Sequence, residues 1–565
     1  MAVEVLIVGA GPTGLTCALL LAQRGVSCRV VERRSGIHNA PQAHVISQRT
    51  MEIYRSLDID AAKFQAIATP PEDMGTVRWV TTLAGSALGA FQLATTERVA
   101  KILGAGPVPG ANISQDLLEK LLLDEVVARG IPLDFDTEWL ASTQFEGGVR
   151  STLKRGGVDL REEVESRYLL ACDGAASPVR EALEIACPGD RSVETFLAIQ
   201  IAADLRDIVA TRPALLYWVM HPDAQGVFIA HDLSARWVLM QPVDPTVTDV
   251  SRLSESEIRD RVRLAIGKDH PFEVVSKGIW TMTAVVADKY RDKNIFLIGD
   301  SAHRFPPTGG MGLNTGVADA FNIAWKISDV LRGVADPGLL DSYEIERRPV
   351  AKAICATSLE NHRKMIEVVA ATGIAPGSSR DEIITRLEDV ANDAGKLEKV
   401  QAAIDRQVNH FDMTGLDVGQ CYEEGAIISD GSEVVYRSNP VADYVPNGRP
   451  GARLPHRWTV HHGEVASTID LVASTGFTLF AGPEAEDWAT AGEALGLQII
   501  EVGKLGWDDA TLAAWLGACE IDRTGALLIR PDQHIAWRSR CDQPDARQRL
   551  SETISSLARK GERKL

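Results

Sequence analysis

The sequence contains no C-x-x-C pair, no H-E-x-x-H and no G-x-S-x-G. It therefore carries no signature of a zinc site, a dithiol centre or a hydrolase nucleophile, and no metal is predicted. Most of its cysteines are flanked by apolar residues, so we interpret them as small core residues. The eight are Cys17, Cys28, Cys172, Cys187, Cys355, Cys421, Cys519 and Cys541.

Long apolar runs and an excess of positive charge are also missing. No uninterrupted apolar run reaches the roughly 20 residues of a membrane-spanning helix. The chain opens on MAVEVLIVGAG, without a basic leader segment. The formal net charge of −18 disfavours nucleic acid and anionic membranes as partners. We therefore expect a cytoplasmic protein with no nucleic-acid or membrane partner, in which backbone amides could still bind an anionic cofactor.

What the sequence does contain begins with a dinucleotide-binding fingerprint. An apolar strand at Val3–Val8 leads into a glycine turn and a helix, and a second strand at Ser27–Val31 ends in Glu32. In this motif the glycines form the turn and admit a pyrophosphate, and the acid binds a ribose hydroxyl. The acid disfavours a 2′-phosphate, so FAD or NAD is expected here. The turn residues are Gly9, Gly11, Pro12, Thr13 and Gly14.

A second glycine-rich stretch, around which the chain is organised, covers Phe296–Trp325. A short apolar strand at Ile295–Ile298 is followed by Asp300 and a loop rich in glycine and proline. From Leu313 onward, apolar residues recur at helical spacing. A strand, a glycine loop and a helix start together predict an anion site, because free N–H groups and the helix dipole point at the ligand.

The segment GDSAHRFPPTGGMGLNTGVADAFNIAWK resembles the second flavin motif of the class A flavin-dependent aromatic hydroxylases. The resemblance implies tightly bound, non-covalent FAD, with NADH or NADPH and O2 as co-substrates. It implies that Asp300 contacts the ribityl chain of FAD and that the loop after the prolines faces the flavin ring. The loop residues are Pro307, Gly310, Met311, Gly312, Leu313 and Asn314.

Three further segments are similar to that family. R-T-M-E at 49–52 follows a loop in which the family often has Pro-Arg-Ala and this chain has Pro41-Gln42-Ala43. The departure leaves Arg33 or Arg49 to contact the pyrophosphate. The helix starting near Ile113 resembles one whose glutamine reaches the flavin, here Gln115; the alternative is an ordinary polar residue in the first turn of a helix. D-G-x-x-S-x-V-R, from Asp173 to Arg180, resembles an element that serves FAD and the nicotinamide cofactor.

The order of these segments predicts an α/β protein of three parts. Residues 1–185 and 285–412 would form a discontinuous Rossmann-type FAD-binding domain with a helical extension. Residues 186–284 contain short strands separated by turns, which predict an inserted antiparallel substrate sheet. Residues 413–565 resemble the C-terminal thioredoxin-like domain of the phenol-hydroxylase branch. We interpret that domain as structural, because no cysteine pair occupies the redox position, and a homodimer surface is one reading of it.

In this family the flavin carries the reaction, through a C4a-hydroperoxide that a nucleophilic ring attacks. A base that ionises the phenol would help. His44, before the R-T motif, is our candidate, because histidine titrates near neutral pH; the alternative is a surface-loop histidine. Tyr217 and Trp218 are neighbours on a strand and so face opposite sides. One should face the substrate, although core packing would explain either. His231 and Arg236 are weaker candidates.

The predicted function is FAD-dependent hydroxylation of a small phenolic substrate. One alternative is hydroxylation of a larger polyketide or antibiotic ring. Another is a non-catalytic FAD-binding redox module, which the complete set of flavin motifs disfavours.

Overall fold

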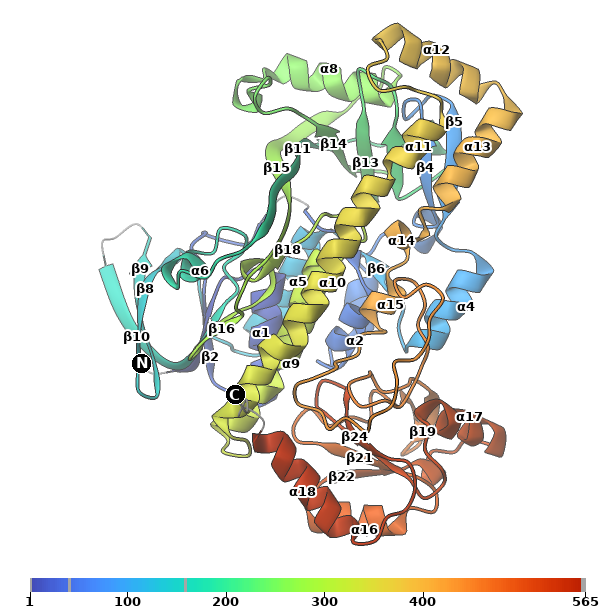
Figure 1. The fold of residues 1–565 in the computed structure, drawn as a ribbon. Helices are drawn as coiled ribbons and strands as arrows, with labels where there is room; N and C mark the ends of the chain where they lie inside the picture. The colour runs from blue at the N-terminus through green and yellow to red at the C-terminus, as the bar shows by residue number, and fades with distance from the viewer. Residues whose placement is uncertain (1–2, 39–41, 157–159, 560–565) are drawn as a thin grey trace.

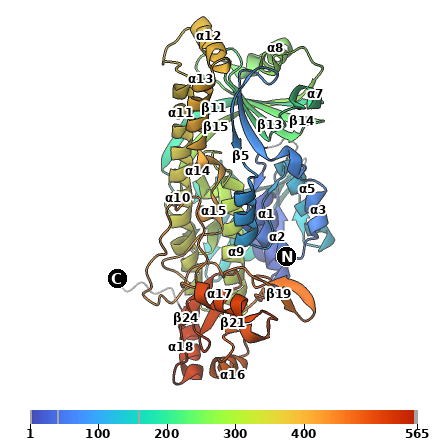
Figure 2. The same ribbon diagram turned by 90° about the vertical axis from the view of Figure 1, so that its right-hand side faces the viewer.

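The computed structural model describes residues 3–38, 42–156 and 160–559 and contains two eight-stranded sheets and a C-terminal α/β domain (Figures 1 and 2). A long helix, α10 (Ser342–Lys364), runs along the molecule from the C-terminal domain to the second sheet. The α/β class, the FAD-binding fold and the inserted sheet are as predicted. Within the described residues, no helix is both long and apolar enough to span a bilayer.

The first sheet is built on four adjacent parallel strands in the order β17-β10-β1-β2. All four are almost entirely apolar where they pair, as expected for strands buried on both faces. Helices α1 (Pro12–Gln23), α5 (Gln115–Ala128) and α9 (Gly312–Leu331) pack around it. The strands of this sheet are β1 (Val3–Val8), β2 (Cys28–Val31), β7 (Leu133–Asp134), β8 (Thr137–Phe145), β9 (Gly148–Arg155), β10 (Leu160–Ala171), β16 (Arg291–Asp292) and β17 (Ile295–Leu297).

The second sheet has the order β18-β15-β11-β14-β13-β12-β4-β5. It is antiparallel except where β12 pairs with β4. Two of its strands, β4 and β5, come from the N-terminal part of the chain, ahead of the expected insertion at 186–284. Helix α8 (Glu255–Ile266) covers one face through an apolar core. The strands are β4 (Thr76–Val80), β5 (Ala87–Gln92), β11 (Gly189–Ala202), β12 (Leu216–Val219), β13 (Gly226–Asp232), β14 (Arg236–Pro242), β15 (Glu273–Val286) and β18 (His303–Arg304).

The helical region after residue 340 is a series of helices. Beyond α10 the chain folds into short helices that pack, together with β4 and β5, around a separate apolar cluster. A capping box formed by Ser379 and Glu382 starts the helix at Arg380–Ala391. The helices are α11 (Ile366–Ala371), α12 (Arg380–Ala391), α13 (Ala394–Asp405), α14 (Val408–Phe411) and α15 (Thr414–Asp417).

The C-terminal domain is a four-stranded mixed sheet in the order β22-β21-β23-β24, flanked by helices. Its α/β character is as expected, and the segment AWRSR lies largely in an edge strand. The strands are β21 (Thr478–Ala481), β22 (Gln498–Glu501), β23 (Ala526–Ile529) and β24 (Ile535–Ser539), and the helices are α16 (Glu486–Ala494), α17 (Asp509–Cys519) and α18 (Ala546–Arg559).

Candidate active site

The predicted motifs meet at one edge of the first sheet. The glycine turn follows β1, Glu32 follows β2, Asp173 lies just after β10, and Asp300 just after β17. These strands are adjacent and parallel, so their carboxyl ends lie together. The crevice outside the carboxyl ends of parallel strands is where α/β sheets bind ligands.

The three glycines of the turn have different surroundings. Gly9 has φ +105°, and a Cβ there would overlap the carbonyl of Cys172. A Cβ on Gly14 would overlap the carbonyl oxygen of Gly9, so this glycine permits close helix–strand packing. A Cβ on Gly11 would meet nothing within 4 Å. Gly11 therefore borders open space at the start of α1, where Pro12 occupies the first helical position.

The carboxylate of Glu32 lies against this turn. One oxygen accepts from the Ala10 N–H at 2.9 Å and the other from Arg34 Nε at 3.0 Å. Burial opposes ionisation, but the hydrogen bonds from Arg34 and Ala10 outweigh it and lower the pKa of Glu32. Arg34 was not among the predicted site residues, although it is only two residues after Glu32 in the sequence. Arg33, which was a candidate, is exposed.

Arg49, the second candidate for the pyrophosphate, is used elsewhere. Its buried guanidinium donates to Glu52 at 3.0 Å, to Gln533 at 2.5 Å and to the Asp532 carbonyl at 2.8 Å. It therefore joins α2 (Gln48–Arg55) to the C-terminal domain. The structure gives no support to Arg49 as a pyrophosphate contact, because its donors already have protein acceptors, one of them 484 residues away in sequence.

Asp173 and Asp300 both retain unused acceptor capacity. Asp173 Oδ2 accepts from the Val179 N–H in the first turn of α6 (Pro178–Ala182), whereas its buried Oδ1 has no partner. Asp300 is solvent-accessible, and no hydrogen bond joins its side chain to another described residue. It is nevertheless closely surrounded by protein, and this desolvation raises its pKa. Its carboxylate is accessible and can accept a hydrogen bond from a ligand.

The loop that carries Asp300 is fixed from two sides. Arg180 donates to the carbonyl of Ser301 at 2.9 Å, so it is a structural tie and not a solvated helix residue. On α9, the buried Asp319 accepts from His303 Nε2 at 2.7 Å and from Arg347 Nε at 2.7 Å. Sequence reasoning missed Asp319, which lies in the middle of an apolar helix face without a recognisable spacing.

The two glycine motifs touch through Thr13. A Cβ on Gly299 would lie 2.9 Å from Thr13 Oγ1, and one on Gly316 would lie 2.5 Å from the same atom. The starts of α1 and α9 can approach only because both positions lack side chains. Two helix N-termini therefore face the same edge of the sheet, a favourable environment for an anion.

The loop after the prolines packs against the segment that contains His44. Asn314 Nδ2 donates to the Val45 carbonyl at 2.9 Å, and its Oδ1 accepts from the Ser47 N–H at 2.8 Å. A Cβ on Gly310 would lie 2.7 Å from Val45 Cβ. Of the other predicted loop residues, Met311 is buried in the core and Gly312 borders open space. Pro307 is exposed, and Leu313 is half-buried.

His44 lies immediately before β3 (Val45–Ile46), which pairs with β6 (Ala111–Asn112). Its Nδ1 lies 2.6 Å from Asn112 Oδ1, and its ring lies 5.6 Å from that of His231, edge to face. Burial lowers the pKa of His44 and outweighs the hydrogen bond to Asn112, which raises it. The imidazole is therefore neutral at pH 7. Asn112 was not predicted, since a two-residue strand carries no detectable motif.

Gln115 fixes the approach to His44. Its Oε1 accepts from the Ala43 N–H at 3.2 Å, and its Nε2 donates to the buried Glu119 at 2.8 Å. Of the Pro41-Gln42-Ala43 segment, Pro41 lies outside the described residues.

The two aromatic candidates lie on opposite faces of the second sheet, as their adjacency predicts. Tyr217 is buried in the core under α8, and its hydroxyl donates to the Arg212 carbonyl at 3.0 Å. Tyr217 is therefore a core residue on this face of the sheet. Trp218 stacks on Trp79 and meets His410 edge-on, and its Nε1 is buried without a partner. Neither ring contacts His44 among the ring pairs of the described residues.

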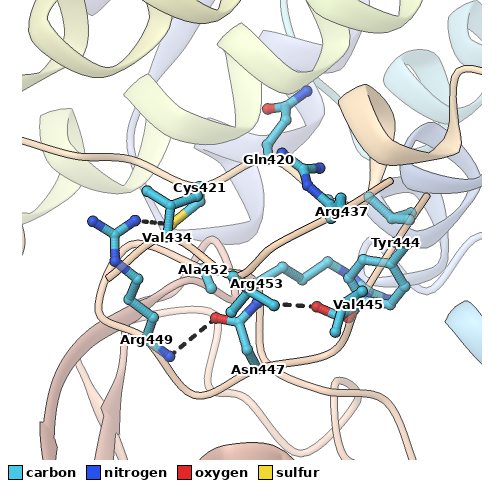
Figure 3. A pocket seen from close by; sticks show the side chains of 13 residues that line it. Gln420, Cys421, Val434, Arg437, Tyr444, Val445, Asn447, Arg449, Ala452 and Arg453 are labelled. Carbon is cyan, nitrogen blue, oxygen red and sulfur yellow. Dashed lines mark hydrogen bonds between the residues drawn. The ribbon is translucent and has the colours of Figure 1, made fainter. Parts of the chain in front are cut away.

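A partly open pocket of about 30 Å³, room for one or two water molecules, lies at the junction with the C-terminal domain (Figure 3). It is lined by Tyr444, Arg449 and Arg453, among others, and is far too small for a dinucleotide. In the part of the chain that the structure describes, no group of three or more His, Cys, Asp or Glu side chains could hold a metal ion.

The edge of the first sheet fits FAD. Gly11 and Gly312 border open space, Asp173 and Asp300 have acceptors to spare, and two helix N-termini converge there. These are the groups that a pyrophosphate, a ribityl chain and a flat ring need.

Comparisons with known proteins agree with this geometry. Residues 2–358 match the family model of an FAD binding domain, and residues 447–558 match that of the C-terminal domain of aromatic-ring hydroxylases. The chain is 32% identical to 2,4-dichlorophenol 6-monooxygenase of Delftia acidovorans, over 95% of this chain and 94% of that protein. It is 31% identical to tetracenomycin A2 monooxygenase-dioxygenase of Streptomyces glaucescens, over 98% and 96%. The crystal structure of the flavin-dependent monooxygenase PieE with FAD and substrate superposes with a TM-score of 0.92 at 32% identity, covering 99% of each chain.

Proposed function

This chain belongs to the FAD-dependent aromatic-ring hydroxylases, and we propose that its substrate is a phenol, that NADH or NADPH is its reductant, and that His44 is its base. FAD, when bound, supplies the electron transfer and the oxygen chemistry. The protein's part is to hold FAD, keep water away and make the ring nucleophilic.

The observation that carries the proposal is the position of His44. The loop from Gly310 to Asn314, which would cover the flavin ring, is hydrogen-bonded through Asn314 to the Val45 carbonyl and the Ser47 N–H, just after His44 in the chain. A substrate lying against that ring therefore comes within reach of the imidazole. Burial lowers the pKa of His44, so the ring is neutral and can accept a proton at neutral pH. A phenolate is a far better nucleophile than a phenol, and His44 would provide it by general-base catalysis.

Different residues would bind different parts of FAD. Gly11 and the start of α1 would lie under the pyrophosphate, and Glu32 would bind the ribose of the adenosine half. Asp300 would accept from a ribityl or ribose hydroxyl. Their support is the open space at Gly11, the position of Glu32 beside the turn, and the unpaired carboxylate of Asp300.

A second candidate substrate is a larger polyketide ring. The relative from Streptomyces glaucescens acts on tetracenomycin A2, by its name, and its identity to this chain is almost that of the dichlorophenol enzyme. The same base would serve a larger ring whose reacting part carries a phenolic hydroxyl.

Oxidation of NADH and NADPH, measured with a panel of simple and polycyclic phenols and followed by product analysis, tests the proposal. A phenol should stimulate oxidation and be recovered with one added hydroxyl. If no phenol of either size does so while FAD is bound, the chain is a redox module or has a different substrate.

His44→Ala should slow ring hydroxylation on the order of 10²-fold, the usual contribution of a general base. Flavin reduction should change little, and hydrogen peroxide should replace the hydroxylated product. A nitrophenol, which ionises by itself, should suffer less. Stopped-flow kinetics with product and peroxide yields measure this, and His462→Ala, at an exposed histidine of the C-terminal domain, is the control. Full coupling of the His44 variant on a phenol of high pKa would remove His44 from the mechanism.

A further inference from the structure

A chain of side-chain hydrogen bonds runs from His44 into the second sheet. His44 Nδ1 lies 2.6 Å from Asn112 Oδ1, and Asn112 Nδ2 donates to Thr69 Oγ1 at 2.6 Å. Thr69 Oγ1 donates to the carbonyl oxygen of His231 at 2.8 Å. The four residues come from four separate segments. Backbone bonds from Thr69 N to Asn112 O and from Ile113 N to His44 O hold three of these segments together.

The chemistry of the last acceptor sets the direction of the whole chain. A backbone carbonyl has no proton, so the single hydroxyl proton of Thr69 must go to His231 O. Thr69 Oγ1 can then only accept from Asn112, which places the amide NH₂ toward Thr69. The amide oxygen of Asn112 is therefore turned to His44. An amide oxygen cannot donate, so His44 Nδ1 must carry the proton, and the lone pair of the neutral ring is on Nε2.

We propose that Asn112 and Thr69 are positioning residues that hold His44 in its Nδ1–H tautomer, which makes Nε2 the atom that takes the phenol proton. The inference rests on the proposed role of His44 as the base. In the step itself the phenol O–H bond breaks and an N–H bond forms at Nε2. The ring becomes an imidazolium whose Nδ1–H still donates to Asn112. Solvent removes the Nε2 proton after the product leaves.

The groups around His44 leave Asn112 as its principal polar partner. The ring of His231 stands edge to face with it, and Arg236 is paired with Asp116 at 2.6 Å. Burial, together with His44 and Arg236, lowers the pKa of His231 far below its usual value, so this neighbour is neutral. His231 has both ring nitrogens buried without a partner, so it neither donates to His44 nor competes for Asn112. Substitutions at Asn112 should therefore act directly on the titration of His44.

Two variants of Asn112 should move the acid limb of the pH profile of kcat/KM in opposite directions. Asn112→Asp puts a carboxylate against Nδ1–H, which favours the imidazolium and moves the limb to higher pH. Asn112→Leu removes the hydrogen bond that raises the pKa, and moves the limb to lower pH while the rate falls. A merely structural role would change the rate of both without these opposed shifts. Identical profiles for wild type and both variants, with FAD bound, would overturn the inference.

Thr69 supplies the sharper test, since it never contacts His44. Thr69→Val keeps the shape but frees the amide of Asn112 to turn its NH₂ toward Nδ1, which favours the wrong tautomer. The rate on a phenol of high pKa should fall about three- to tenfold, the equivalent of one neutral hydrogen bond. Thr69→Ser should restore it. If valine and serine behave alike, the hydroxyl does not set the tautomer.

The tautomer can also be observed without turnover. In the holoenzyme labelled with ¹⁵N-histidine, the His44 signals, assigned by their loss in His44→Ala, should show a protonated Nδ1 and an unprotonated Nε2. A protonated Nε2 would overturn the inference even if His44→Ala is inactive. The expected tautomer together with a fully coupled His44→Ala enzyme would instead overturn the base role, and with it the catalytic meaning of the tautomer.

Discussion

The edge of the first sheet and the junction with the C-terminal domain both carry charged side chains, but they differ in how these are paired. At the junction, Glu346 accepts through both oxygens. Oε1 binds Arg530 at 2.8 Å and the Ala426 N–H at 2.7 Å, while Oε2 binds Lys326 at 2.7 Å and Asn322 at 2.6 Å. At the sheet edge, Asp173 Oδ1 has no partner and Asp300 makes no hydrogen bond to the described residues.

Whether a charged side chain has a hydrogen-bond partner distinguishes the structural region from the proposed functional one better than whether it is buried. Buried polar groups in proteins are nearly always hydrogen-bonded, so an unpaired one calls for an explanation. The junction needs none, because its charges satisfy one another and join α9 and α10 to the C-terminal domain. The sheet edge is explained by a ligand that completes it. Three substitutions would break or sharpen this contrast.

The largest effect is expected at Gly11. Gly11→Val should abolish flavin retention, because its side chain would occupy the open space proposed for the pyrophosphate. The apoprotein should still fold, since a Cβ there meets nothing within 4 Å. Gly14→Ala is the matched contrast, because its Cβ would overlap the Gly9 carbonyl and should destabilise the fold itself. Flavin absorbance and thermal unfolding measure both, and yellow Gly11→Val protein would refute the assignment.

At the junction, Glu346→Gln should cost about 3–5 kcal/mol of unfolding free energy, because it leaves buried cations uncompensated. The folded variant should bind FAD normally. Glu255→Gln, which breaks the exposed pair with Arg259, should cost about 0.5 kcal/mol or less. Urea unfolding compares them, and equal costs would mean that the buried network adds nothing.

The Glu346 contribution should also depend on pH. Burial opposes its ionisation, but Arg530 and Lys326 outweigh burial and lower the pKa of Glu346 to about 2 from the usual 4.5. A depressed carboxyl pKa stabilises the fold above the unfolded value. The difference between wild type and Glu346→Gln should therefore be complete above pH 4.5 and shrink as the pH falls toward 2.

The smallest effect is expected at Asp300. Asp300→Ala should raise the dissociation constant of FAD about two- to tenfold, which corresponds to one hydrogen bond of about 0.5–1.5 kcal/mol. The stability of the apoprotein should not fall, since this carboxylate has no hydrogen-bond partner to lose and desolvation already raises its pKa. Fluorescence titration of FAD measures the constant, with the exposed Glu464→Ala as control. An unaltered constant would remove the ribityl contact.

Local patterns predicted the elements well and their long-range partners poorly. The antiparallel sheet expected from residues 186–284 is present, and the turn at Gly9–Gly14 joins β1 to α1 as expected. The parallel pairing of β4 with β12 was missed, because nothing within Thr76–Val80 points to a partner about 140 residues later. Arg49 was assigned to the cofactor for the same reason, since its acceptors in the C-terminal domain leave no mark on the residues beside it.

The sequence by itself determined the dinucleotide-binding fold and the order of its glycine motifs, because glycine spacing and strand periodicity are local. The aromatic-hydroxylase family followed from the resemblance of those motifs to the flavin motifs of that family. Only the tertiary structure decided which face of the second sheet Tyr217 occupies, where the guanidinium of Arg49 is used, and that Asn112 and Thr69 stand behind His44. Each of these depends on side chains brought together from distant segments. A hydrogen bond between such segments is fixed by packing and has no counterpart in the order of residues along the chain.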